Sequence, residues 1–158
     1  MVKVGIGFDL HRLVENRKLF LGGVEIPYIK GLLGHSDGDV LLHALADAIL
    51  GGIGEEDLGE HFPDSDLSYE NVSSSFFIEK ILDLAHKRGY RILNVDTIIV
   101  AEEPKLTPFK KKIKENLARM LKIDVANIAM KAKTNEGVGE LGRREAIASY
   151  VVILLEKE

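Results

Sequence analysis

The strongest constraint on the fold is the alternation of residue types near the start of the chain, in VKVGIGFDLH. The even positions of this stretch are all apolar, whereas the odd positions hold Lys3, Gly5, Gly7, Asp9 and His11. Because successive side chains of a β-strand point to opposite faces, a period of two predicts a strand with Asp9 and His11 on one face. An isolated pair of this kind usually contacts solvent, so other features of the sequence are needed to show whether Asp9 and His11 belong to a site.

The composition is that of one globular domain spanning residues 1–158. Apolar residues make up 46% of the chain and charged residues 29%, which supports a real core and excludes a disordered or fibrous chain. No apolar run approaches the roughly 20 residues that span a bilayer, and no secretory leader is recognisable. We therefore expect a cytoplasmic protein that does not bind membranes.

The chain has no cysteine and a net charge of −4. Disulfides and thiolate metal ligands are excluded, so any metal must be bound by histidine or carboxylate side chains. The negative charge, without a basic stripe, argues against nucleic acid as a partner. The lysine-rich stretch FKKKIKENLARML fits the solvated face of an amphipathic helix.

Periodicity and capping residues predict the remaining elements. KLFLGGVEIPY predicts a hairpin around two glycines. Helices are expected near 38–51, capped by Ser36 or Asp37, and over SSSFFIEKILDLAHK before Gly89. A third helix is expected over LTPFKKKIKENLARML, with Thr107 as its cap. The segments RILNVDTIIVAE, NIAMKAK and REAIASYVVILLE predict strands.

This order of elements predicts an α/β (α+β) sandwich, in which a mixed four-stranded sheet has helices on one face. The other face of the sheet includes apolar residues of the last strand and must be buried against something. We expect identical subunits to bury it, and therefore a homo-oligomer.

The first predicted helix holds Asp39, His43 and Asp47 at intervals of four, which places them on one stripe. A lone helical histidine more often has no special role. If the stripe faces the polar side of the first strand, however, Asp9, His11 and His43 form an N,N,O donor set. An open fourth position would then suit zinc acting on a substrate. Asp39 or Asp47 is expected to hold the imidazole of His43.

Two loops have compositions that fit phosphate groups. GHSDGD places His35 and Ser36 before a helix N-terminus, where free N–H groups favour anions. A capping box of Ser36 with Asp39 explains the same residues equally well. KAKTNEGVGELGRRE places Thr134 and Glu136 among glycines, and such a loop can bring N–H groups and a carboxylate to a diphosphate and its cation.

Five segments together resemble the 2-C-methyl-D-erythritol 2,4-cyclodiphosphate synthase family of the non-mevalonate isoprenoid pathway. They are GFDLHR, KGLLGHSDGDVLLHALADAILG, LGEHFPDSD, NVDTIIVAEEPKL and KAKTNEGVGELGRREAIA, in the family's order and spacing. The resemblance implies a lyase that converts 4-diphosphocytidyl-2-C-methyl-D-erythritol 2-phosphate to the cyclic diphosphate and CMP. It also implies a homotrimer with active sites shared between subunits.

The resemblance also implies which residues form the site. Zn²⁺, one per subunit, is expected on Asp9, His11 and His43, and a second divalent cation, Mg²⁺ or Mn²⁺, on Glu136. His35 and Thr134 are expected to be catalytic. Substrate binding is implied for Asp9, His11, His35, Ser36, Asp57, Leu58, Gly59, Phe62, Pro63, Asp64, Ser65, Asp66, Ala101, Glu102, Glu103, Pro104, Lys105, Leu106, Lys133, Thr134, Asn135, Glu136 and Arg143.

One position departs from the family pattern. Members described as binding isoprenoid diphosphates on the trimer axis commonly have an aromatic residue where this chain has Glu140, close to an arginine that matches Arg143. We expect Glu140 to pair with Arg143 or Arg144, within or across subunits, because an unpaired buried carboxylate is costly. Isoprenoid diphosphates should then bind weakly or not at all.

Two other functions fit the same residues. A metal-dependent phosphodiesterase would use the same ligands with a positioned water and release a linear product. A non-catalytic trimer would bind cytidine phosphates without turnover. Analysis of the product distinguishes all three.

Overall fold

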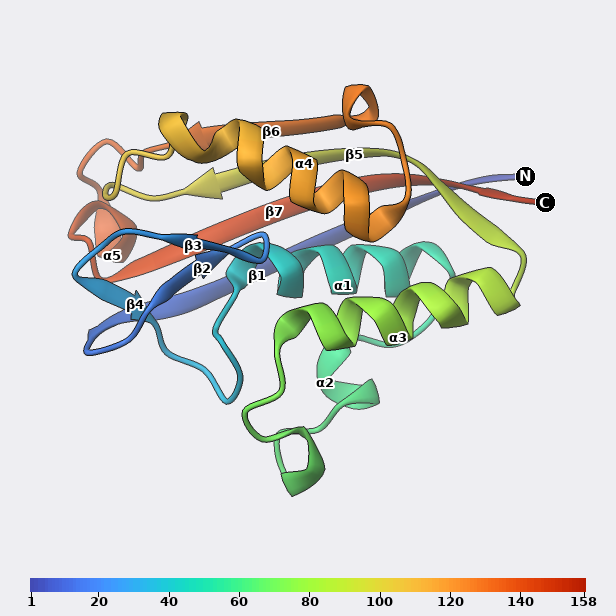
Figure 1. Ribbon diagram of the computed structural model, residues 1–158, viewed down its shortest axis with the longest axis horizontal. Coiled ribbons are helices and arrows are strands. Elements are labelled where there is room, and N and C mark those ends of the chain that lie inside the picture. The colour runs from blue at the N-terminus through green and yellow to red at the C-terminus, as the bar shows by residue number, and fades with distance from the viewer.

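A computed structural model describes all residues 1–158 (Figure 1). The strands are β1 (Val2–Glu15), β2 (Leu19–Leu21), β3 (Val24–Ile26), β4 (Lys30–Leu32), β5 (Tyr90–Val100), β6 (Ile128–Lys133) and β7 (Ala146–Lys157). The helices are α1 (Val40–Gly52), α2 (Leu58–His61), α3 (Ser74–Lys87), α4 (Lys110–Leu121) and α5 (Gly139–Gly142), with 3₁₀ turns at Leu67–Tyr69, Thr107–Phe109 and Val125–Asn127. The expected hairpin is formed by β2 and β3.

The main sheet has five strands, one more than expected, in the order β4-β1-β7-β5-β6. It is mixed, because β7 is antiparallel to both β1 and β5 while β5 and β6 are parallel. The additional strand is β4, whose three residues pair with the end of β1. The prediction of four strands was wrong because the tripeptide KGL is too short to show a period.

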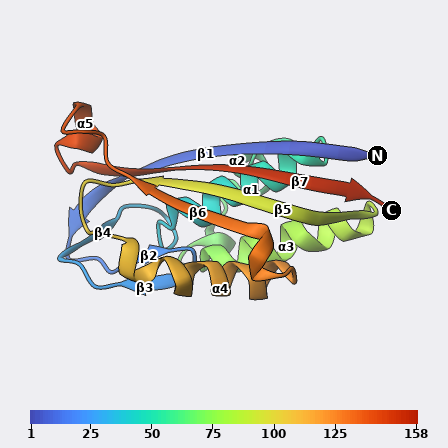
Figure 2. The same ribbon diagram turned by 90° about the horizontal axis from the view of Figure 1, so that it is seen from above.

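The three long helices, α1, α3 and α4, lie on one side of the sheet, as expected, and the short α5 lies at one end of it (Figures 1 and 2). α1 packs directly on β1 and β7, α3 packs against α1, and α4 packs against β6. Leu45 and Ile49 of α1 are fully buried in the core between these layers. No helix is both long and apolar enough to cross a bilayer.

The polar face of β1, rather than its apolar face, packs against the helices. Gly5 and Gly7 are buried against α1, whereas Ile6 is 70% exposed on the other face. A Cβ atom on Gly5 or Gly7 would overlap a backbone carbonyl of α1. The glycines therefore let the helix backbone lie directly on the strand. The polar face of β1 is the inner face, and Asp9 and His11 are held beside α1.

The opposite face of the sheet is apolar and exposed. Its exposed side chains are Val4, Ile6, Phe8, Leu10, Tyr150 and Val152. Phe8 and Tyr150 are cross-strand partners whose ring centroids are 4.9 Å apart. An exposed apolar surface of this kind is typical of a face that other proteins cover.

Asp39 is the N-cap of α1 and is fully buried. Its carboxylate accepts hydrogen bonds from the backbone N–H groups of Leu42 at 3.0 Å, Gly22 at 3.0 Å and Gly23 at 2.7 Å. Burial raises the pKa of Asp39 to about 6, although the bonds from Gly23 and Leu42 oppose this shift. One side chain thus joins the start of α1 to the turn between β2 and β3.

We expect Asp39→Ala to lower the free energy of unfolding by at least about 2 kcal/mol, because the buried N–H groups of Leu42 and Gly22 lose their acceptor at about 1–3 kcal/mol each, and the N–H of Gly23 can bond to water instead. Asp124→Ala is the control, since Asp124 accepts one backbone N–H, from Ala126 at 2.8 Å, in an exposed turn. That variant should lose about 1 kcal/mol or less. Urea unfolding at a fixed chain concentration measures both, and equal losses would contradict the role given to Asp39.

Candidate active site

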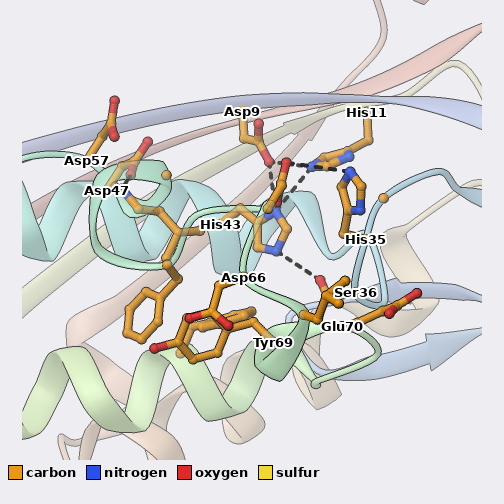
Figure 3. A pocket seen from close by; sticks show the side chains of 17 residues that line it. Asp9, His11, His35, Ser36, His43, Asp47, Asp57, Asp66, Tyr69 and Glu70 are labelled. Carbon is orange, nitrogen blue, oxygen red and sulfur yellow. Dashed lines mark hydrogen bonds and ion pairs between the residues drawn. The ribbon is translucent and has the colours of Figure 1, made fainter.

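Asp9 and His11 of β1 meet His43 of α1 on the inner side of the sheet (Figure 3). Asp9 Oδ2 lies 2.6 Å from His11 Nε2 and 3.2 Å from His43 Nδ1, and the two nitrogens are 3.1 Å apart. All three atoms lie within 4.8 Å of one another, so one metal ion could contact them together. The structure therefore brings together the three residues expected as ligands. One carboxylate oxygen and two imidazole nitrogens suit zinc, and three protein ligands leave a fourth position open.

The protonation of this group follows from its contacts. Burial would raise the pKa of Asp9, but hydrogen bonds with His11 and His43 outweigh burial and lower the pKa to about 2. Burial would lower the pKa of His11, but its hydrogen bond with Asp9 raises that pKa overall. His11 Nδ1 lies 2.6 Å from the carbonyl oxygen of Leu33, which holds the ring with Nε2 toward Asp9.

The carboxylates expected to hold His43 have other partners. Asp39 accepts backbone N–H groups at the start of α1, and Asp47 accepts the N–H of Leu58 at 2.8 Å. Burial raises the pKa of Asp47. The expectation was wrong because each carboxylate instead accepts hydrogen bonds from backbone N–H groups. The capping box is also absent, since Asp39 itself caps α1 in place of Ser36 or Asp37.

A cavity of about 480 Å³ lies over the three residues (Figure 3). The other expected substrate-binding residues that line it are His35, Ser36, Asp57, Leu58, Gly59, Phe62, Asp64 and Asp66. Pro63 and Ser65 belong to the same loop but are not among the lining residues. His35 is exposed, and its Nε2 lies 3.6 Å from Asp64 Oδ2, so the loops before α1 and after α2 approach each other here.

One wall of the cavity is aromatic, and the sequence indicated only part of it. The ring centroid of Phe62 lies 5.2 Å from that of Tyr69 and 4.8 Å from that of Phe77. Tyr69 and Phe77 also line the cavity but were not predicted. The run SYENVSSSFF contains both, yet an aromatic residue in the first turn of a helix, such as Phe77, is more often part of the core, and Tyr69 lies in a short turn with no distinctive pattern. The wall sets an apolar surface beside the polar Asp9, His11 and His43.

Apart from Arg143, which follows α5, the remaining expected residues form a second group away from the cavity. The parallel strands β5 and β6 end side by side, where Val100 faces Lys133 and the N–H of Ala101 donates to the carbonyl of Lys133 at 2.8 Å. The segments 101–106 and 133–136 are therefore adjacent. No residue of either segment lines the cavity. The two residues expected to be catalytic are therefore separated within one chain, since His35 lines the cavity and Thr134 belongs to the second group.

Glu102 organises this second group. Its Oε1 accepts the backbone N–H groups of Asn135 at 2.8 Å and Gly137 at 3.1 Å. Thr134 Oγ1 accepts the N–H of Glu136 at 3.3 Å, and Glu136 has a left-handed φ of 51°. Thr134 and Glu136 are both exposed. A hydroxyl and a carboxylate are thus presented on a loop whose backbone is held by Glu102.

The expected pairing of Glu140 does not form within one chain. Arg143 Nε lies 3.0 Å from Glu145 Oε1, and Arg144 Nη2 lies 3.3 Å from Glu103 Oε1. Hydrogen bonding to Glu145 raises the pKa of Arg143. The prediction was wrong for the isolated chain because nearer carboxylates bind both arginines. A pairing of Glu140 across subunits stays a prediction.

The chain is an α/β protein whose sheet is covered by helices on one face, and its Asp9, His11 and His43 side chains border a cavity. This combination is typical of metal-dependent enzymes that act on small molecules. The model of the YgbB family matches residues 2–156, and the chain belongs to this family. Two curated relatives are named 2-C-methyl-D-erythritol 2,4-cyclodiphosphate synthase. The protein from Geotalea uraniireducens is 54% identical over 99% of this chain and 100% of its own length. The protein from Syntrophomonas wolfei is 47% identical over 99% of each.

Solved structures have the same fold. The CDP complex of IspF from Plasmodium falciparum has a TM-score of 0.87 and 36% identity, covering 99% of this chain and 97% of that one. The bifunctional IspDF from Campylobacter jejuni has a TM-score of 0.96 and 40% identity over all of this chain, which spans 43% of that longer protein. These similarities confirm the mixed α/β fold and the family resemblance expected from the sequence.

Proposed function

We propose that the chain is a 2-C-methyl-D-erythritol 2,4-cyclodiphosphate synthase, a lyase of isoprenoid biosynthesis. The 2-phosphate of 4-diphosphocytidyl-2-C-methyl-D-erythritol 2-phosphate attacks the β-phosphorus of the same molecule. The bond from that phosphorus to the CMP oxygen breaks, and CMP leaves. The observation that carries the proposal is the Asp9, His11 and His43 group in its cavity, within a chain 54% identical to a curated synthase over nearly its full length.

This reaction needs positioning and charge neutralisation more than a base. A phosphate monoester is already an anion near neutral pH, so the barrier comes from repulsion between phosphates and from closing an eight-membered ring. We assign Zn²⁺, one per subunit, to Asp9, His11 and His43, where it would polarise the β-phosphate when bound. Orientation of the flexible substrate by the cavity can contribute roughly 7–11 kcal/mol in favourable cases.

The loops around the cavity are proposed to bind the methylerythritol half of the substrate. Ser36 Oγ lies 3.4 Å from His43 Nε2, so a phosphate bound by His35 and Ser36 would lie beside the ligands. His35 would polarise the reacting group. The segment 57–66 would close over the sugar-derived chain of the substrate. The carboxylates of this segment would accept hydrogen bonds from the substrate's hydroxyl groups, and Phe62 would contact its methyl group.

The group at the ends of β5 and β6 is proposed to bind the nucleotide half. The backbone of 101–106 would bind cytosine, and Lys133, Thr134 and Asn135 the diphosphate, with Thr134 polarising the reacting phosphate. Glu136 is the proposed ligand of a second divalent cation, Mg²⁺ or Mn²⁺, since an exposed carboxylate suits a cation that prefers oxygen. The Plasmodium falciparum relative, solved as a CDP complex, supports a nucleotide site.

We infer that the protein acts as a homotrimer with active sites between subunits. The exposed apolar face of the sheet supports an assembly, because burying it removes apolar surface from water. The separation of the two groups of site residues supports a shared site, since a neighbouring copy could bring its nucleotide group to the cavity. The proposal includes a cytoplasmic location, because the substrate is multiply charged and would not cross a membrane unaided.

We expect Glu136→Gln to raise the magnesium concentration needed for half-maximal turnover by about tenfold or more, because a cation loses a charged ligand. Zinc content should not change, since Glu136 lies outside the Asp9, His11 and His43 group. Glu140→Gln is the control, an exposed carboxylate six residues short of β7. Turnover titrated against magnesium is the measurement. An unchanged requirement in Glu136→Gln would remove this residue from the second cation site.

Phosphorus NMR of the protein with substrate, zinc and magnesium tests the proposed reaction. We expect resonances of the cyclic diphosphate and of CMP to grow together. A linear product that contains oxygen from labelled water would instead establish a phosphodiesterase. Unchanged substrate resonances in the presence of tight binding would establish a binding protein.

A further inference from the structure

Three consecutive serines precede or begin α3, and only the middle one is buried. Ser74 is 1% exposed, whereas Ser73 and Ser75 are exposed. Ser74 Oγ lies 2.9 Å from Nε2 of His43, the ring nitrogen that does not face Asp9. Ser74 Oγ in turn donates to Oδ1 of Asp37. A continuous path of hydrogen bonds therefore runs from Asp37 through Ser74 to His43.

The donors and acceptors along this path determine the tautomer of His43. A carboxylate can only accept, so the single proton of the Ser74 hydroxyl goes to Asp37. The hydroxyl oxygen must then accept at its other side, and His43 Nε2 must be the donor. An imidazole with its proton on Nε2 has its lone pair on Nδ1, the atom that lies 3.1 Å from His11 Nε2.

A second hydroxyl lies near the same nitrogen but is less suited to this role. Ser36 Oγ is 3.4 Å from His43 Nε2, compared with 2.9 Å for Ser74. Ser36 lines the cavity and Ser74 does not. The Ser36 hydroxyl is therefore available to a ligand in the cavity, whereas the Ser74 hydroxyl contacts only other parts of the protein.

Asp37 is itself held firmly. Its Oδ2 accepts the backbone N–H of Ser74 at 3.0 Å, and its Oδ1 accepts the N–H of Asp39 at 3.1 Å. One carboxylate thus bonds to the start of α3 and to the residue that caps α1. Because His43 lies on α1, the ring and the hydroxyl that contacts it are fixed relative to each other.

We propose that Ser74 and Asp37 form a positioning pair, which holds His43 with Nδ1 free for the metal. This inference rests on the proposed metal site. His11 has the equivalent support from the carbonyl of Leu33, which lies 2.6 Å from its Nδ1. Both imidazoles are then oriented through the nitrogen that does not bind metal, an arrangement that fixes ring direction and strengthens metal binding.

Ser74→Ala removes the acceptor of His43 Nε2 and should weaken zinc affinity by about 10–100-fold. Ser75→Ala is the matched control, because it removes an exposed hydroxyl one residue further along the same helix. Zinc affinity is measured by competition with a chelator, and circular dichroism of each variant reports whether the fold is intact. Equal zinc affinities for the folded Ser74→Ala variant and the wild type would overturn the inference.

Nitrogen NMR of the zinc-loaded wild type, labelled at histidine, tests the same inference without a variant. We expect His43 to show a protonated Nε2 whose hydrogen exchanges slowly with water, unlike that of the exposed His86. Coordination of zinc through Nε2, or exchange as fast as in His86, would overturn the positioning pair while leaving the metal site in place. Failure of the wild type to bind zinc at all would overturn the metal site and the inference with it.

Discussion

Replacing His43 by alanine is expected to abolish zinc retention and to lower turnover by at least about 1000-fold. The variant keeps Asp9 and His11, which are only two of the three ligands. A catalytic metal stabilises the transition state by several kcal/mol, and each loss of about 1.4 kcal/mol lowers the rate tenfold. The fold should persist, because the His43 side chain bonds only to other polar side chains, those of Asp9, His11, Ser36 and Ser74, and to no backbone group. Metal analysis and product formation measure the two losses.

His86→Ala is the control for this experiment. His86 lies on the exposed surface of α3 and does not line the cavity over Asp9, His11 and His43. Its replacement should leave zinc content and turnover unchanged. Full zinc occupancy in His43→Ala would remove His43 from the site, even if turnover fell.

Most elements of the fold could be predicted from local patterns, because each pattern maps directly onto backbone geometry. The alternation over residues 2–11 correctly placed Asp9 and His11 on one face of a strand. It could not show that this face is the inner one, since polarity alone predicts the reverse. The decisive factor is size, because Gly5 and Gly7 allow α1 to approach and leave the apolar side chains of β1 outside.

The contacts of the site residues were harder to predict than the residues themselves. A spacing of four correctly placed His43 and Asp47 one turn apart on α1, but Asp39 is the N-cap before the helix, and spacing does not show which donors each carboxylate binds. The partner of His43 is Ser74, which is 31 positions away and comes from another helix. Long-range packing of α3 against α1 determines that contact, and no local pattern encodes it.

The two groups of predicted site residues show a further limit of the sequence. Motifs appear in one linear order, but neither the order nor the spacing says which of them meet within one subunit. The parallel pairing of β5 with β6 brings 101–106 to 133–136 and leaves both outside the cavity. Their meeting with Asp9 and His43 in an assembly of subunits is therefore a proposal that no linear motif could supply.

Replacing Gly7 by alanine should damage the metal site although Gly7 binds nothing. A Cβ atom at this position would overlap the backbone carbonyl of Ala44, which directly follows His43 in α1. A backbone carbonyl cannot turn aside as a flexible side chain can, so α1 must move away from β1. The movement would separate His43 from Asp9 and His11, and a misplacement of about 1 Å can cost about 100-fold in rate.

Gly51→Ala provides the matched control, since it adds the same methyl group to α1 where no atom lies within 4 Å. That variant should keep full activity and gain up to about 1 kcal/mol, because alanine is the better helix former. Gly7→Ala should instead lose about 1–3 kcal/mol of unfolding free energy through overpacking, together with most of its zinc affinity. Zinc competition, turnover and urea unfolding measure these effects. Normal turnover and zinc affinity in Gly7→Ala would show that the close approach of α1 to β1 does not position His43.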